Sequence, residues 1–368
     1  MLAPISIREE AVSPKTDEFL ARQPGGLIYD ASSYTGLIDA MARCRTSQIS
    51  CYQNGALVAF MPIATRQAAG FKVVNSLPYF GSHGGPLIDV RIGGPAKEQL
   101  LDALLSYLNS YCAANNIDAI TIVTNPFLEE TADWLVENFK CDHSVFRVGQ
   151  YQQLPAKGDG VDAIEAALQA CFDPLRMRNI RKAQKSGVTI RKSMEWPDFF
   201  FLYEASKLNM EANGLSSKTV EFYRYVFEQF SAKNSHLYIA EQGGAPIAAL
   251  LNLSFNGNYE YFVPATLHEH RNSQPSSLLI YESMKDAAIN NGLLWNWGGS
   301  GDGTGGVYDF KKKWGASDSR YYYLNKIYNP EILLLTPEDL KNNFPYFFVA
   351  PFDKLLGVPR AASDTTTA

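Results

Sequence analysis

The chain has 368 residues, of which 46% are hydrophobic and 19% charged, and its net charge is -5. This length favours two domains over one, with enough apolar residues for a sizeable core. The acidic balance excludes a protein that binds nucleic acid over its whole surface, so contact with a polyanion needs a local basic patch. Apolar runs stay below the roughly 18 residues of a membrane span, and residues 1–10 show no signal-peptide pattern, so we expect a cytoplasmic protein.

The cysteines and histidines indicate neither a disulfide framework nor a metal site. The five cysteines are an odd number, and no two of them show Cys-x-x-Cys spacing. Of the five histidines, His268 and His270 are too close in sequence to be metal ligands on one face of a helix. We therefore expect reduced cysteines and no metal.

In the first half, a hairpin precedes a helix and a buried strand. Residues 50–59 hold an Asn-Gly turn between apolar runs, which is a strong short-range hairpin pattern. Residues 96–116 place leucines at helical spacing and predict an amphipathic helix. Residues 117–123 are rich in β-branched side chains and predict a strand.

A polar, glycine-containing segment at 154–160 predicts a domain boundary. Beyond it, residues 238–249, 276–291 and 293–297 repeat the order hairpin, helix, strand. The repeat indicates two domains of one fold, although common elements also recur by coincidence. Four further helices are predicted between the boundary and the second repeat: 161–172, 173–186, 197–213 and 218–232.

These elements predict an α/β protein with three parts. The first domain spans 1–153, the second spans 154–330, and an extension spans 331–368. The polar end after Gly357 is expected to be disordered.

The strongest charge feature is a basic segment at 176–192 that contains no acidic residue. Four of its cations follow the spacing i, i+3, i+4, i+7 and share one face of a predicted helix: Arg178, Arg181, Lys182 and Lys185. Such a face can bind phosphates. The alternative is a solvated helix whose ion pairs lie elsewhere.

A glycine-rich turn follows the apolar run at 293–297, and a lysine cluster at 311–313 comes soon after it. Glycines allow a ligand to approach the main chain closely, and a lysine supplies a cation where negative charge develops. This pattern indicates a site for an oxyanion or a phosphate. The alternative is a surface loop followed by solvated lysines.

Four motifs resemble the Fem family of bacterial aminoacyltransferases, which are built from tandem GNAT-like domains. The segment Arg178 to Val188 resembles the family's Arg-x-x-Ile-Arg-x-Ala-x-x-x-Gly-Val signature, and Trp297 to Ser300 resembles its Asp/Asn-x-Gly-Gly-Ser segment. The segment Phe310 to Gly315 is similar to its Phe-Lys-x-x-Phe/Trp-Gly motif, and Tyr79 to Pro86 is similar to the Gly-Gly-Pro turn of its first domain. The match covers about residues 45–325.

The resemblance implies two tandem GNAT-like domains, each with a mixed central sheet flanked by helices, and transfer of an aminoacyl group from aminoacyl-tRNA to an amine of a peptidoglycan precursor. By position, Lys311 would contact the reacting ester or its oxyanion, and Phe310 would pack against the donor. The turn at 79–84 would bind acceptor at a cleft shared with the second domain. The other expected substrate contacts are Arg178, Arg181, Arg271, Tyr261, Trp297, Gly298, Gly299, Ser300, Tyr79, His83 and Gly84.

Departures from the family keep other donors and acceptors open. No long heptad segment for tRNA is visible, and Arg271 to Ser277 stands where the acetyl-CoA loop of GNAT domains has glycines. Relatives also act in polysaccharide and secondary-metabolite pathways, so the expected acceptor is an amine of a cell-envelope glycan or a sugar-nucleotide precursor. The alternatives are an acyl-CoA-dependent N-acyltransferase and a non-catalytic tandem-GNAT protein that binds a glycan or nucleotide.

No cofactor is expected besides the donor substrate, aminoacyl-tRNA or acyl-CoA. No motif names the general base, and its candidates are Asp302, Asp309, Glu260 and His83. Attack of an amine on an activated ester needs little base catalysis, so orientation and oxyanion stabilisation would dominate.

Overall fold

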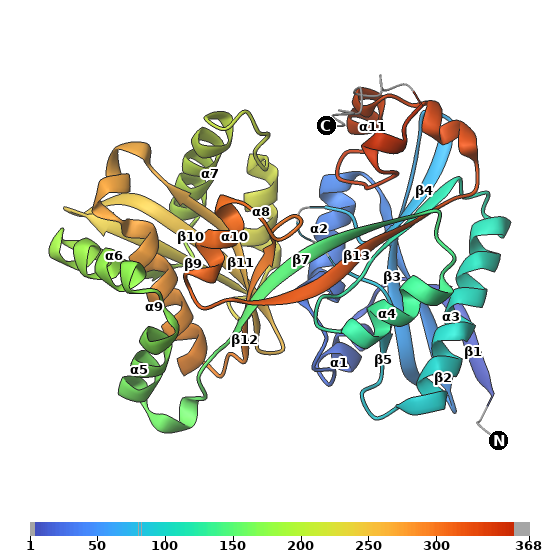
Figure 1. Cartoon of the computed structure of the whole chain (residues 1–368), viewed down its shortest axis with the longest axis horizontal. Coiled ribbons are helices and arrows are strands. Elements are labelled where there is room, and N and C mark those ends of the chain that lie inside the picture. The colour runs from blue at the N-terminus through green and yellow to red at the C-terminus, as the bar shows by residue number, and fades with distance from the viewer. Residues whose placement is uncertain (1–3, 80, 82, 357–368) are drawn as a thin grey trace, which may run out of the picture. The chain divides into compact units, whose positions relative to one another are not determined.

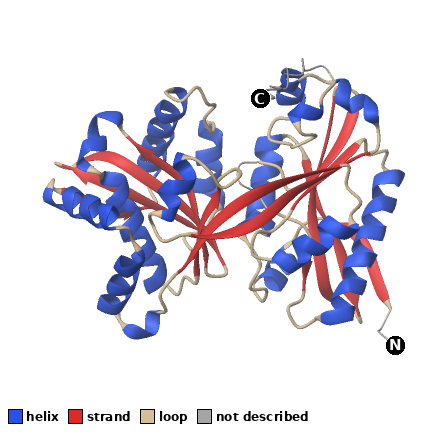
Figure 2. Cartoon of the chain, in the orientation of Figure 1, coloured by secondary structure: helices blue, strands red, loops and turns tan. Residues whose placement is uncertain are grey.

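The computed structural model describes residues 4–79, 81 and 83–356, and the chain divides into two compact units. Unit 1 comprises residues 1–25, 29–147 and 320–368, and unit 2 comprises residues 26–28 and 148–319. Helices flank a sheet of strands in each unit (Figure 2).

The sheet of unit 1 is mixed, with the strand order β1-β2-β3-β4-β6-β13, and the short β5 pairs with β3. Neighbouring strands are antiparallel except β4 and β6, which are parallel because helix α3 lies between them in the chain. The first part of β7, up to residue 147, also belongs to this unit. The bounds are β1 Ile5–Glu10, β2 Arg45–Gln53, β3 Ala56–Ala68, β4 Phe71–Ser76, β5 Leu87–Ile88, β6 Ala119–Val123, β7 His143–Gln153 and β13 Ser317–Ile327.

Two sets of helices cover the strands of unit 1. Helices α3 (Gly94–Ala114) and α4 (Glu129–Asn138) bury leucines against alternate residues of the strands, among them Ile120 and Ile122. The C-terminal segment with α11 (Pro337–Asn343) packs against strand residues of the opposite parity, including Val73 and Ala119. Helices α1 (Pro14–Leu20) and α2 (Ser32–Ala42) complete the unit (Figure 1).

The sheet of unit 2 has the order β7-β12-β11-β10-β9-β8, and only β11 and β12 are parallel neighbours. Here α9 (Pro275–Ile289) connects the parallel pair, as α3 does in unit 1. Three antiparallel strands, a helix and a parallel strand therefore occur in the same order in both units, which confirms the predicted repeat. The bounds are β8 Val188–Ser193, β9 Ser235–Gln242, β10 Ala245–Phe255, β11 Asn258–Thr266 and β12 Leu294–Gly299.

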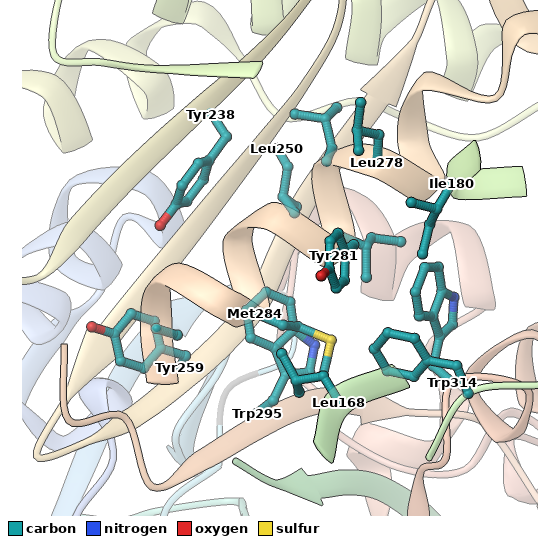
Figure 3. Close-up of a cluster of buried hydrophobic side chains, with 14 of the residues drawn as sticks. Leu168, Ile180, Tyr238, Leu250, Tyr259, Leu278, Tyr281, Met284, Trp295 and Trp314 are labelled. Carbon is teal, nitrogen blue, oxygen red and sulfur yellow. The ribbon is translucent and has the colours of Figure 1, made fainter. Parts of the chain in front are cut away.

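The core of unit 2 forms where α9 packs on the strands (Figure 3). Tyr238, Leu250 and Tyr259 of the strands meet Leu278 and Met284 of the helix there. Helix α7 packs on β10 and β11 as well. The other helices are α5 Val161–Cys171, α6 Pro174–Lys185, α7 Trp196–Glu211, α8 Val220–Gln229 and α10 Gly306–Lys312.

The predicted hairpins, the two connecting helices and the helices α5 to α8 are confirmed, with ends that differ by a few residues. The unit boundaries differ from those expected from the sequence. Strand β7 runs from unit 1 into unit 2, so the chain crosses at 147/148 and not at 153/154. Residues 331–356, expected to be an extension, pack into unit 1 because Ile332, Leu340 and Phe344 join its core.

The disordered end that we expect after Gly357 lies outside the described residues. Within the described part, no helix combines the length and the apolar character that a membrane crossing requires.

Candidate active site

The parallel strands β11 and β12 of unit 2 are paired only near their beginnings. Asn258, Tyr259 and Glu260 pair with Leu294, Trp295 and Asn296. The pairing of β12 with β7 also shifts register between Asn296 and Gly298. Trp297, Gly298 and Gly299 therefore have no partner on β11, although Gly298 and Gly299 still pair with Gln150 and Gly149 of β7.

Lys311 reaches the end of β12 from the short helix α10. Its Nζ donates hydrogen bonds to the carbonyl oxygens of Gly298 and Gly299, at 3.1 and 2.8 Å. The residue is only 5% exposed, whereas Gly299 is exposed. Burial without a carboxylate partner among the described residues lowers the pKa of Lys311 to about 8. A cation thus lies next to the open end of β12.

The turn after β12 is held by a chain of hydrogen bonds. Gly298 adopts a positive φ of 73°, which favours glycine, and its N–H donates to Oδ1 of Asn296 at 2.9 Å. Nδ2 of Asn296 donates to Oε2 of Glu260 at 2.8 Å. Ser300 Oγ contacts Gln150 Oε1 at 2.5 Å. Glu260 and Gln150 therefore position the glycine-rich turn, a role that the sequence did not reveal.

Trp297 lies in an aromatic cluster that includes Phe310 and Trp314, which flank Lys311 in the sequence. Trp297 lies 5.1 Å from Tyr261, 6.0 Å from Trp314 and 6.3 Å from Phe310, measured between ring centroids. The last residue of the motif, Gly315, must be glycine. Its φ is 85°, and a Cβ there would lie 2.7 Å from the carbonyl oxygen of Cys171. Phe310, Tyr261 and Trp297, three predicted site residues, are thus brought together.

Arg176 is part of this aromatic cluster and was missed as a site residue. Its guanidinium carbon lies 4.5 Å from the Phe310 ring centroid and 5.5 Å from that of Trp314, within cation–π range. Desolvation lowers its pKa. Its Nε and the indole nitrogens of Trp297 and Trp314 are buried without an acceptor among the described residues. Arg176 therefore adds a desolvated cation to the aromatic cluster.

The basic face of α6 is exposed as predicted. Arg178, Arg181, Lys182 and Lys185 all face solvent, and none of them pairs with a carboxylate within the described residues. Arg176 lies on the other side of the same helix, together with the buried Ile180. The helix therefore presents one cation to the aromatic cluster and four to solvent.

The segment before α9 differs in sequence from an acetyl-CoA loop but keeps a backbone conformation that suits glycine. Gln274 has a φ of 59° at the residue before the helix, and Ser276 contacts Thr266 through their hydroxyl groups at 2.6 Å. Arg271 is exposed on a 3-10 helix (His268–Ser273), where its Nη2 lies 3.4 Å from Oδ1 of Asn209. The structure does not bring Arg271 into the cluster around Trp297.

Tyr79, His83 and Gly84 are buried within unit 1. The rings of Tyr29 and Tyr321 flank His83 at 5.8 and 4.7 Å, and desolvation lowers the pKa of His83 to about 4. Tyr79 packs on Tyr346 at 4.8 Å. Gly84 leaves no room for a side chain, because a Cβ would lie 2.7 Å from the carbonyl oxygen of Ser76. Tyr79, His83 and Gly84 are thus part of the packing of unit 1, and their contact with acceptor stays a prediction.

The candidates for a general base differ in their surroundings. Asp302 and Asp309 are exposed, and Asp302 accepts hydrogen bonds from Thr304. Glu260 is 2% exposed and is bound by Asn296, and His83 is neutral at neutral pH. No candidate is singled out by these contacts.

Comparison with known proteins agrees with this geometry. Residues 176–312 match the family described as an acetyltransferase (GNAT) domain, which spans the basic helix and Lys311. Fold comparison matches FemX over 88% of this chain and 98% of that chain, with a TM-score of 0.67 at 13% identity. The chain has a Fem-like tandem GNAT fold. It contains an acyltransferase domain, and the mixed α/β architecture predicted from the sequence is confirmed.

Two further structures share the fold. A tandem GNAT protein from the clavulanic acid biosynthesis pathway matches over 88% of this chain and 98% of that chain, with a TM-score of 0.51 at 11% identity. The C-terminal domain of a putative lysylphosphatidylglycerol synthetase from Agrobacterium fabrum matches over 84% and 90%, with a TM-score of 0.52 at 12% identity. No curated protein matches the chain by sequence.

Proposed function

We propose that this chain is an N-acyltransferase that moves an aminoacyl group from aminoacyl-tRNA to an amine of a cell-envelope glycan or sugar-nucleotide precursor. The observation that carries the proposal is Lys311. It is a buried cation without a carboxylate partner in the described structure, and it contacts the carbonyl groups of Gly298 and Gly299 where β12 no longer pairs with β11. A cation in a desolvated position suits an oxygen that becomes negative during acyl transfer.

The reaction that fits this site needs few groups. The amine of the acceptor attacks the ester carbonyl, a C–N bond forms, and the C–O bond to the tRNA ribose breaks. The leaving hydroxyl takes the proton that the amine loses. Lys311 would stabilise the negative oxygen of the tetrahedral intermediate, and Phe310, Trp297 and Tyr261 would pack against the donor. The turn at 79–84, with Tyr79, His83 and Gly84, would bind acceptor.

The choice of an aminoacyl donor rests on two supports. The exposed cations of α6, Arg178 and Arg181 among them, have no carboxylate partner in the described part of the chain and suit the phosphates of an acceptor stem. FemX and the C-terminal domain of a lysylphosphatidylglycerol synthetase share the fold.

An acyl-CoA donor is the second candidate, and a specific observation favours it. Gln274 holds the left-handed conformation at the start of α9, so the loop geometry that precedes a phosphate-binding helix persists without glycine. The exposed Arg271 on the preceding 3-10 helix would then pair with a phosphate of the donor.

A donor competition assay tests the proposal. The purified chain is incubated with amino-containing sugar-nucleotide and glycan precursors, once with tRNA charged with labelled amino acids and once with an acyl-CoA pool. Mass spectrometry then searches for acylated amines. Products from charged tRNA alone support the proposal, and products from acyl-CoA alone assign the second candidate. Binding of a precursor without turnover from either donor would make the chain a non-catalytic binding protein.

A further inference from the structure

Unit 1 contains a cavity of about 510 Å³ that is separate from the residues assigned to acyl transfer. The C-terminal segment from α11 to Asp353 forms most of its wall, and the first part of β7 contributes Val145 and Arg147. Helix α11 marks this region in Figure 1. All of the lining residues belong to unit 1.

The cavity wall is mostly apolar and rich in aromatic rings. Phe344, Phe347, Phe348 and Phe352 line it together with Tyr346. A volume of this size lies within the range of about 300–1,000 Å³ that is usual for small-molecule sites. Such a wall suits the ring or the chain of a small apolar ligand.

Two cations of the cavity wall lack an anionic partner. Arg147 and Lys341 make no ion pair or side-chain hydrogen bond with the described residues. Asp353 is the carboxylate of the lining, and Lys354 neutralises it at 3.1 Å. Arg147 is half-buried, and the nearby phenols of Tyr321 and Tyr323 are neutral because burial raises their pKa values. The cavity therefore has a net positive charge inside an apolar wall.

The wall is anchored to the sheet and is thus formed before any ligand binds. Thr121 Oγ1 donates to the carbonyl oxygen of Phe348 at 2.7 Å, and Nδ2 of Asn325 donates to that of Val349 at 2.6 Å. The Phe348 ring also packs on Tyr323, at 4.9 Å between centroids. A preformed site loses less conformational entropy on binding.

We propose that this cavity binds a small apolar carboxylate, with its ring or acyl chain among the phenylalanines and its carboxylate on Arg147. The planar guanidinium of arginine matches a carboxylate with two parallel hydrogen bonds. Lys341 adds a second, more exposed charge to the lining. The lining includes none of the residues assigned to acyl transfer, although Tyr346 of the wall packs on Tyr79 of the turn that we expect to bind acceptor.

Isothermal titration calorimetry on the full chain tests the proposal with matched ligands. Two probes are carboxylates: 2-naphthoate has an aromatic ring system and decanoate an alkyl chain. Their uncharged counterparts are 2-naphthamide and decanol. We expect at least one carboxylate to bind about tenfold or more tightly than its neutral match, on the scale of a charge-assisted hydrogen bond. The carboxylate that binds more tightly shows whether the cavity prefers an aromatic ring or an acyl chain.

Substitutions of the two lining cations test whether the carboxylate binds in this cavity. Arg147→Met should weaken the carboxylate about tenfold or more and leave the neutral match unchanged, and Lys341→Met should weaken it by a smaller factor. Arg22→Met is the control, because Arg22 is exposed in unit 1 and does not line the cavity. A thermal melt checks that each variant is folded. If Arg147→Met unfolds, the binding affinity of Lys341→Met still tests the proposal, because Lys341 is exposed.

Three results would overturn the inference. One is the lack of binding of either carboxylate at millimolar concentration, and another is equal affinity for charged and neutral probes. The third is a carboxylate affinity that changes in neither Arg147→Met nor Lys341→Met.

Discussion

At the scale of single residues, Lys311 differs from its two neighbours in sequence. Lys312 and Lys313 are exposed, and Lys312 pairs with Asp318 at 3.4 Å, whereas Lys311 is buried against two carbonyl groups. We expect Lys311→Ala to lower kcat by roughly 10²–10³, the scale of losing one oxyanion donor. Lys312→Ala and Lys313→Ala are the matched controls and should change kcat less. Equal losses at all three positions, measured on folded variants, would indicate a diffuse patch and not a catalytic lysine.

The pKa of Lys311 gives a prediction about pH. Desolvation lowers this pKa from 10.5 to about 8, so the ammonium form, which can stabilise an oxyanion, is lost as pH rises through 8. The proton-free acceptor amine increases over the same range. We expect kcat to rise and then fall, with the falling limb near pH 8. Lys311→Met should retain only the rising limb, and a falling limb that persists in this variant would assign it to another group.

The candidate site was only partly predictable because it combines residues that lie far apart in the sequence. Lys311, Phe310 and Trp297 were found because they belong to local motifs. Arg176 was missed because its contact with Phe310 joins segments 134 residues apart. One signal was available: Arg176 precedes the buried Ile180 by four positions and so lies on the buried side of the helix. Its role next to an aromatic ring could not be derived from that spacing.

At the scale of elements, helix α6 carries a prediction about salt. If its four exposed cations bind a tRNA acceptor stem, three or four phosphate contacts give a slope of log K against log salt of about -2 to -4. Arg181→Gln and Lys185→Gln should each make the slope shallower by about one contact. Lys157→Gln is the control, because Lys157 is exposed on another element of unit 2. Filter binding with charged tRNA measures the slope, and a flat salt response would exclude a tRNA contact at α6.

The turn at 79–84 carries a prediction about stability. A methyl group at Gly84 would lie 2.7 Å from the carbonyl oxygen of Ser76, which belongs to the main chain and cannot move aside easily. Gly84→Ala should therefore reduce the free energy of unfolding by about 1–3 kcal/mol. At Gly158 a methyl group would meet no atom of the described residues within 4 Å, so Gly158→Ala should change the free energy of unfolding little. Urea denaturation measures both, and an unchanged midpoint for Gly84→Ala would contradict the tight packing of this turn.

Elements were easier to predict than their roles. The hairpin turns at Asn54 and Gly243, the leucine spacing of α3 and the Asn-Gly end of α9 are local patterns, and the structure has these elements. The glycines at 81–85 were interpreted as a ligand-facing turn. Glycine is equally needed where two main chains approach closely, as Gly84 and Ser76 do, and the sequence does not distinguish the two causes.

At the scale of the whole chain, the C-terminal segment belongs to the core of unit 1. Truncation after Tyr328 would remove Ile332, Leu340 and Phe344 from the cluster around Val73. It would also remove the carbonyl groups that Thr121 and Asn325 bind. We expect the protection of amide hydrogens in β4 and β6 to fall at least tenfold in hydrogen exchange, while β9 to β11 of unit 2 stay protected. Unchanged protection in β4 and β6 would mean that this segment is only an extension.

The return of the chain to unit 1 through β13 has a consequence for biosynthesis. This strand leaves the ribosome after all the other described strands of both units, yet it pairs with β6 inside the sheet of unit 1. Most of unit 2 is continuous in sequence and is complete before β13 emerges. Unit 1 is therefore translated first but cannot complete its sheet until β13 arrives, and one edge of β6 stays unpaired during elongation. Nascent chains in which β12 and α10 have emerged while β13 is still inside the ribosome should bind chaperones through unit 1, while unit 2 already resists protease.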